Sequence, residues 1–120
     1  MGYYKVKFRA ADKNFSRYIR RREACEICGR MDIKLEASHY FGRAKESTRF
    51  DPRNVKCLCF TCHKKTHENK RYFTDFMLKE LGQDGLDKLE LDSNSYQKRD
   101  DKLNKIIISE LLKSVGMKWE

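Results

Sequence analysis

Two Cys-x-x-Cys pairs constrain the fold of this 120-residue chain more than any other feature. The four residues are Cys25, Cys28, Cys59 and Cys62. Four thiolates at this spacing can close a tetrahedral zinc site, and a closed site has no open position for a substrate. The pattern therefore predicts a structural zinc ion. Disulfides and buried free thiols are the alternatives that the pattern leaves.

The fifth cysteine, Cys57, alternates with Val55 and is most simply a buried strand residue. Hydrophobic residues make up 39% of the chain and charged residues 38%, so the core is modest and a structural metal would help to stabilise it. We expect a single domain over residues 1–120. The sequence has no secretory signal and no apolar run near the roughly 20 residues of a membrane span, so we expect reduced thiols, a cytoplasmic location and no membrane partner.

The positive charge is concentrated in the first part of the chain. The formal net charge is +9; residues 1–70 carry 18 Lys and Arg against 8 Asp and Glu, whereas residues 71–120 carry 9 against 10. A positive field around the cysteines and histidines would attract a polyanion, most simply nucleic acid. An inert, solvated basic surface is the competing interpretation.

The hydrophobic pattern predicts an α+β fold in which a hairpin and a helix are linked by the zinc site and flanked by further helices. The expected segments are an N-terminal basic helix at 12–24 with Asp12 as its N-cap, a zinc-linked core at 25–70 with strands at 33–39 and 55–58 around a loop at 42–54, and a helical C-terminal extension at 71–120. In the extension, Gly82 should stop the first helix, and residues 96–115 should form the last.

The three histidines of the chain indicate a second site beside the zinc. His39 lies between the two cysteine pairs, and His63 and His67 follow the last cysteine directly. Because His63 and His67 are four residues apart, a helix would place both rings on one face. Four cysteines suffice for a structural ion, so the histidines remain for chemistry.

At this point the sequence resembles a known family. The stretch "CEIC…EASHYFGR…STRFDPRNVKCLCFTCHKKTH" is similar to the HNH (ββα-metal, His-Me finger) endonuclease fold with zinc-binding cysteine flanks. With "DKNFSRYIRRR" before the first cysteine pair, the chain resembles the phage NinG/Rap recombination nucleases over residues 12–82. The resemblance implies a phage-encoded, metal-dependent DNA endonuclease used in recombination or DNA processing, which would act in the host cytoplasm on branched or Holliday-junction DNA.

The resemblance also implies roles for single residues. His39 would be the general base that activates water, and Asn54 would fix the loop that carries it. His63, with His67 one turn later, would hold a catalytic Mg²⁺ or Mn²⁺ ion. A solvent-facing His67 is the alternative to a ligand.

Ser38 departs from the family pattern. Many family members carry Asp or His before the general base, and serine alone is a poor ligand for Mg²⁺ or Mn²⁺. Ser38 would bind the ion through water, or Glu36 would take its place, or the site would rely on histidines and phosphate oxygens.

Arginine contacts phosphate well because its guanidinium group is a bidentate donor. The expected DNA contacts are Arg17, Arg20, Arg21, Arg22, Arg43, Lys45, Arg49 and Arg53, and Arg43 or Arg49 would also hold the scissile phosphate. Three other interpretations remain open at this stage: a zinc-stabilised DNA-binding module without cleavage, an RNA-directed or toxin-type nuclease, and a homodimer formed through the C-terminal helices.

Overall fold

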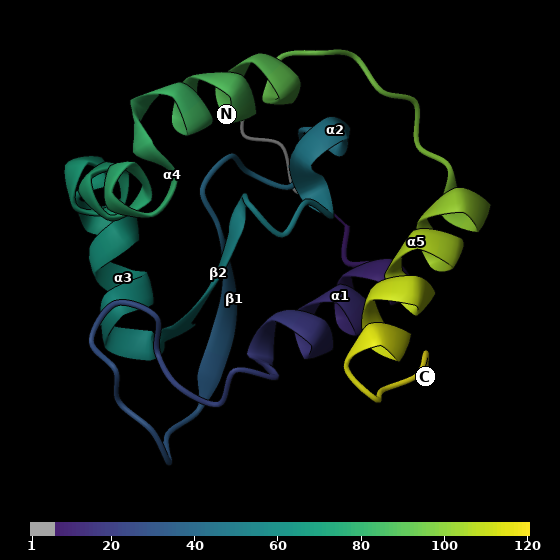
Figure 1. Cartoon of the computed structure of the whole chain (residues 1–120), viewed down its shortest axis with the longest axis horizontal. Coiled ribbons are helices and arrows are strands. Elements are labelled where there is room, and N and C mark those ends of the chain that lie inside the picture. The colour runs from purple at the N-terminus through teal and green to yellow at the C-terminus, as the bar shows by residue number, and fades with distance from the viewer. Residues whose placement is uncertain (1–6) are drawn as a thin grey trace.

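The computed structural model describes residues 7–120, which form a two-stranded hairpin and five helices (Figure 1). The elements are α1 (Ala10–Arg20), β1 (Leu35–His39), α2 (Glu46–Arg49), β2 (Val55–Cys59), α3 (Phe60–Glu68), α4 (Lys70–Ser93) and α5 (Asp101–Ser114). This confirms the α+β architecture, with the hairpin and the helix that follows it between one N-terminal helix and the C-terminal helices.

The hairpin is the scaffold on which the other elements pack. Strands β1 and β2 run antiparallel, with Leu35 opposite Cys59 at one end and His39 opposite Val55 at the other. Because side chains alternate along a strand, Leu35 and Ala37 share one face, which packs on α1 and α5. The other face is turned toward α3, which begins directly after β2. The hairpin therefore fixes where α3 points its histidines.

Helix α1 begins earlier than the sequence suggests. Its N-cap is Arg9, and Asp12, expected to be the cap, is the third helical residue, whose carboxylate accepts the Arg9 N–H at 2.7 Å. A carboxylate in the first turn also interacts favourably with the helix dipole, so Asp12 stabilises this end from inside the helix. Phe15 and Ile19, four residues apart, are buried as the amphipathic pattern predicts. The helix ends at Arg20, four residues before the expected boundary.

The later segments contain more helix than expected. The short helix α2 interrupts the loop expected at 42–54. In α4, Gly82 adopts a φ of 73°, as a helix stop would, but the chain then returns to helix up to Ser93. Helix α5 starts later than predicted because Asp100 caps it: the Asp100 carboxylate accepts the Leu103 N–H at 3.0 Å.

Helix α5 closes the main core and lies beside α1 in Figure 1. Its Ile108 and Leu112 are fully buried in the cluster that contains Phe15 of α1. The backbone N–H of Glu120 donates to the side-chain oxygen of Asn14 at 2.9 Å and so ties the chain's last residue to α1. Helix α4 has its own cluster, which includes Phe73 and receives Tyr40 from the hairpin loop.

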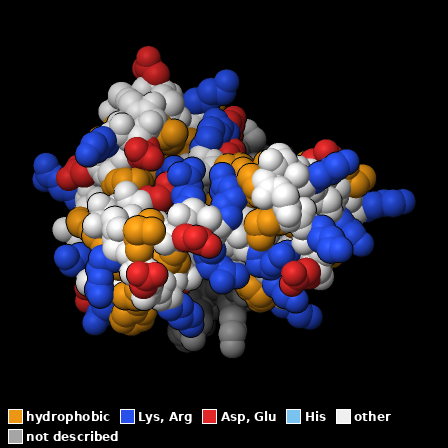
Figure 2. Space-filling model, turned by 60° about the horizontal axis from the view of Figure 1, so that its bottom comes forward, with side chains coloured by type: hydrophobic (Ala, Val, Ile, Leu, Met, Phe, Trp, Pro, Cys, Tyr) orange, Lys and Arg blue, Asp and Glu red, His pale blue; other side chains and the backbone are white. Residues whose placement is uncertain are grey.

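The surface of the described residues is strongly charged. Figure 2 shows one face on which Lys and Arg side chains predominate, with acidic and hydrophobic side chains between them. Among residues 7–120, no helix combines the length and apolarity that crossing a bilayer requires.

Candidate metal centre and histidine site

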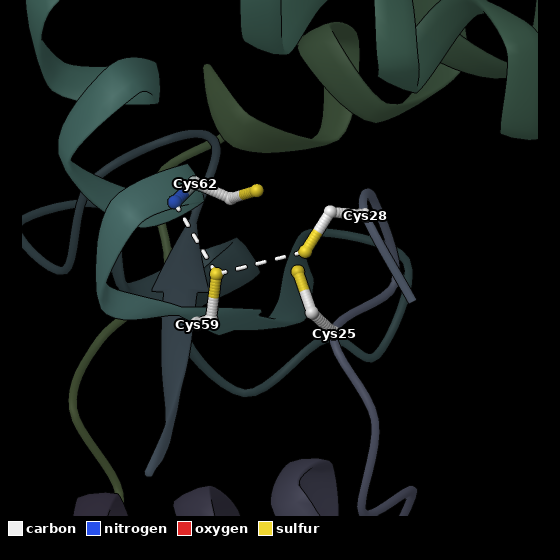
Figure 3. A group of neighbouring side chains, drawn as sticks. All are labelled: Cys25, Cys28, Cys59 and Cys62. Atoms are coloured by element: carbon white, nitrogen blue, oxygen red, sulfur yellow. Dashed lines mark hydrogen bonds between the residues drawn. The ribbon is translucent and has the colours of Figure 1, made fainter. Parts of the chain in front are cut away.

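The four cysteines of the two pairs converge on a common space, as Figure 3 shows. Cys25 and Cys28 come from the turn before β1, Cys59 ends β2, and Cys62 lies in the first turn of α3. All four sulfur atoms lie within 4.8 Å of one another, and the sulfurs of Cys28 and Cys59 are 3.8 Å apart. Tetrahedral zinc with bonds of about 2.3 Å separates its sulfur ligands by about 3.8 Å, so the donor set fits this ion.

Local backbone geometry holds the thiols in place. Gly29 has a φ of 77°, which glycine adopts without strain, and its N–H donates to the Cys25 carbonyl at 2.9 Å to close the turn. Cys59 is the N-cap of α3, and its sulfur accepts the Cys62 N–H at 3.5 Å. The Tyr72 hydroxyl donates to the sulfur of Cys62 at 3.6 Å, so α4 also orients a ligand.

Cys57 is separate from this cluster. It is fully buried on the face of β2 that packs against α1, as the alternation with Val55 predicts. Burial, with the nearby Glu26 carboxylate, raises the pKa of the Cys57 thiol to about 11. A protonated thiol in an apolar cluster is a packing residue and not a ligand.

His39 ends β1 with a defined hydrogen bond on one ring nitrogen. Its Nε2 lies 2.9 Å from the backbone oxygen of Arg49. A carbonyl oxygen only accepts, so Nε2 carries the hydrogen and Nδ1 keeps a free lone pair. Burial, and then the positive charge of Arg43, lowers the pKa of His39 to about 4. The ring is therefore neutral at physiological pH, with Nδ1 available to accept a proton.

Asn54 holds the loop after His39. It is fully buried, and its side-chain oxygen accepts the Phe41 N–H at 2.8 Å. Its amide nitrogen donates to the carbonyls of Phe41 at 2.9 Å and Thr48 at 3.1 Å. Three hydrogen bonds thus fix the two sides of the loop that leads away from the base.

The two histidines of α3 form a pair. The Nε2 atoms of His63 and His67 are 3.2 Å apart, and Nδ1 of His63 lies 2.7 Å from a carboxylate oxygen of Glu36. Glu36 accepts from Nδ1–H, which leaves the lone pair of His63 on Nε2, facing His67. An ion held about 2.1 Å from both nitrogens would see them at an angle of about 100°, which suits a tetrahedral or octahedral cation.

All three histidines open on one cavity of about 420 Å³, which Phe8, Gly42 and Arg43 also line. Ser38 does not line this cavity and is 1% exposed, on the strand face opposite His39. Of the alternatives that the sequence left for the missing acidic ligand, the structure brings Glu36 to the histidine pair, where it orients His63.

The arginines expected to contact phosphate differ in their surroundings. Arg49 is 2% exposed, and its guanidinium group donates to Asp12 in α1, so the expected phosphate contact is wrong for this residue. Arg17 pairs with the C-terminal Glu120, and Arg53 pairs with Asp51 and Asp92. These pairs fix loops and termini and leave less of the positive charge for a ligand.

Other basic side chains remain near the histidine cavity. Arg20 of α1, with Arg43, lines a shallow hollow of about 330 Å³ that also contains His63 and Glu36. Arg21 lies over the Tyr18 ring at 4.0 Å, and the exposed Arg22 pairs with Glu26 at 3.7 Å. Lys45 donates to the Asn94 side chain at 2.9 Å. Arg20 and Arg43 are thus the predicted contacts closest to the candidate catalytic groups.

Two neighbours of the cavity were missed by sequence reasoning. Phe8 lines it from a segment that carries no motif, and no sequence signal indicates this position. Asp12 was interpreted only as a helix cap, although it also binds Arg49 behind His39. The clue available in the sequence was its place at the start of a strongly basic helix, where a lone carboxylate finds arginine partners.

A family model described as "Bacteriophage Lambda NinG protein" matches residues 3–116 of the chain. The comparisons with curated proteins and with solved structures give no match.

Proposed function

The chain belongs to the NinG family of bacteriophage lambda proteins, and on that premise we propose that it is a metal-dependent DNA endonuclease of the HNH (ββα-metal) type. One observation carries the proposal: a neutral histidine with a free Nδ1 and a pair of histidines with facing Nε2 atoms line the same cavity. A general base and a cation site are the two components that phosphodiester hydrolysis requires.

In the proposed reaction, Nδ1 of His39 takes a proton from a water molecule in the cavity, and the water oxygen attacks the phosphorus atom. The new P–O bond forms as the bond from phosphorus to the 3′ oxygen breaks, which leaves a 5′ phosphate and a 3′ hydroxyl. Asn54 keeps the His39 loop in place, and Arg43 stabilises the charge on the phosphate. A divalent ion bound by His63 and His67 would supply charge stabilisation at the leaving oxygen.

Mg²⁺ and Mn²⁺ are the cations we expect at the histidine pair. Two nitrogen ligands leave most of an octahedral coordination sphere to water and phosphate oxygens. Glu36 contributes by holding the His63 ring and by lowering the net positive charge around the ion. The affinity for metal should therefore be modest in the free protein and rise when DNA is bound.

DNA is the expected substrate because the basic side chains lie beside the cavity. Arg20 and Arg43 reach the edge of the histidine site from α1 and from the hairpin loop, respectively. Family membership favours a role in phage recombination, with branched or junction DNA as the substrate. A zinc-stabilised DNA-binding module without cleavage would not need the free Nδ1 of His39, and this observation favours the nuclease.

The proposal is tested with the purified protein, supercoiled plasmid, a four-way DNA junction and single-stranded RNA, each with Mg²⁺, Mn²⁺ or EDTA. We expect metal-dependent cutting of DNA that His39→Ala abolishes and that Lys88→Ala, an exposed change on α4, leaves intact. DNA binding without cutting under every metal condition would establish the binding module instead. Cutting confined to the RNA would establish an RNA nuclease.

We also propose that α5 pairs with α5 of a second copy. The side chains of Leu103, Ile106 and Ile107 are 45–57% exposed and lie on one stripe of the helix. The helix starts with Asp101 and ends near Lys113, so an antiparallel pair would place the acidic start of one helix beside the basic end of the other. Junction DNA, which carries two equivalent strands to cut, would suit such a dimer.

Sedimentation at several protein concentrations tests the dimer. Ile106→Glu should shift the protein to monomer, whereas Leu91→Glu, at an equally exposed apolar position on α4, should not. A wild-type protein that is monomeric at all concentrations would remove the proposed pairing.

A further inference from the structure

A buried ion pair lies directly behind His39. The Asp12 carboxylate of α1 binds the Arg49 guanidinium of α2 through two hydrogen bonds, of 2.6 and 3.0 Å. Their side chains are 1% and 2% exposed. Although burial alone would raise it, the pKa of Asp12 is lowered by the hydrogen bonds from Arg49 and Arg9, so the carboxylate is charged.

Arg49 connects this ion pair to the base through its own backbone. Its carbonyl oxygen is the acceptor for Nε2–H of His39 at 2.9 Å. Its guanidinium also donates to the backbone oxygens of Lys7 at 2.9 Å and Arg43 at 3.1 Å. Helix α2 has only four residues, too few to be stable by itself, so the position of the Arg49 carbonyl depends on these tertiary bonds.

We propose that Asp12 is a positioning residue for His39, acting through Arg49. By holding the Arg49 side chain, Asp12 fixes the carbonyl that keeps the His39 proton on Nε2 and directs the Nδ1 lone pair into the cavity. The N-terminal helix is thereby part of the catalytic apparatus as well as a basic surface. The proposal rests on the proposed function, since it assigns His39 its use as the base.

A purely structural role would not require this arrangement. Buried ion pairs contribute little net stability compared with apolar residues of the same volume, so stability alone does not account for the pair. A second ion pair, Arg9 with Glu46 at 2.8 Å, links the same two helices without binding the Arg49 side chain. It provides a matched control, because its removal loosens α1 from α2 but leaves the bonds of Arg49 intact.

The test compares Asp12→Asn with Glu46→Gln in the full chain. Long-range ¹H–¹⁵N NMR reports which nitrogen of each imidazole is protonated, and the chain has only three histidines to assign. In the wild type, His39 should be protonated on Nε2. Asp12→Asn should produce a mixture of His39 tautomers and lower kcat on plasmid by about 10²-fold, the scale of a misplaced catalytic group, with KM for DNA and zinc content unchanged. Glu46→Gln should leave both readouts at their wild-type values.

The proposal is overturned if Asp12→Asn leaves the His39 tautomer and kcat unchanged, or if Glu46→Gln changes them equally. Arg49→Lys provides the same test should Asp12→Asn fail to fold, since it keeps the charge and loses the bidentate contact. In either Asp12 or Arg49 variant, Asp12→Glu being the conservative comparison, partial recovery of both readouts is expected where a carboxylate is restored. A wild-type protein with the Nε2–H tautomer but no cleavage would refute the nuclease function while leaving the positioning role of Asp12 in place.

Discussion

The cysteine cluster and the histidine cavity share one helix but differ in what they demand of the protein. Cys62 and His63 are neighbours on α3: the first turns into a cluster of four thiols, the second into an open cavity. The cluster has a complete ligand set and joins segments that are more than 30 residues apart in sequence, whereas the histidine pair leaves most ligand positions empty of protein atoms. A closed set stabilises the fold, and an open set admits a substrate.

The difference between the sites leads to an asymmetry in the effects of mutation. Without the cysteine cluster, α3 has no fixed position, so the histidine cavity should be lost together with the fold. Without the histidines, the hairpin and the cluster keep all their contacts. The following predictions test this asymmetry, from the largest effect to the smallest.

Loss of a zinc ligand should have the largest effect. Binding of structural zinc contributes on the order of 10–16 kcal/mol, as much as the whole stability of a typical domain, so Cys59→Ser and Cys25→Ser should unfold or aggregate the protein. Cys57→Ser, a change in the buried thiol outside the cluster, should keep its zinc. Metal analysis with circular dichroism measures both. Zinc retained by Cys59→Ser and lost by Cys57→Ser would show that the ligand set is wrongly assigned.

Loss of a catalytic histidine should abolish cutting and little else. His39→Ala removes the base, and we expect plasmid cleavage to fall by about 10²-fold or more, with zinc content and DNA affinity at wild-type levels. His63→Ala should fall at least as far, because it removes the ligand that Glu36 orients. Nicking by His39→Ala at the wild-type rate would refute the proposed mechanism.

How well the sequence predicted each site follows from the range of the interactions involved. The cysteine pairs, the i to i+4 spacing of His63 and His67 and the alternation around Cys57 are local patterns, and the structure has all of them in the expected elements. The pairing of Asp12 with Arg49 spans 37 residues and depends on how α1 docks on the hairpin loop, which no local pattern encodes. Arg49 therefore looked like a phosphate contact in the sequence, since burial by a distant partner cannot be read from its neighbours.

A change in Glu36 should have an intermediate effect. Glu36→Gln keeps the size of the side chain but weakens the acceptor for Nδ1–H of His63, and loss of such a partner typically costs 10- to 100-fold in metal affinity. We expect a higher Mn²⁺ concentration for half-maximal cleavage, with the rate recovering at saturating metal. Ser38→Ala, at the buried neighbouring position on the same strand face, is the matched control and should leave the metal dependence unchanged. The reverse result would return the ligand position to Ser38.

The smallest effect is expected from single basic residues at the rim of the cavity. DNA binding by the basic half of the chain should weaken steeply with salt, because each phosphate contact releases a counterion. Arg20→Ala, beside His63, should lower the slope of log K against log salt by about 0.9 on duplex DNA, the value for one contact. Arg99→Ala, on the exposed segment before α5 and paired with Asp101, should leave the slope unchanged. Fluorescence anisotropy titrations between low and physiological salt measure the slopes. Equal slopes for Arg20→Ala and the wild type would move the DNA path away from α1, whereas a reduced slope for Arg99→Ala would extend it toward α5.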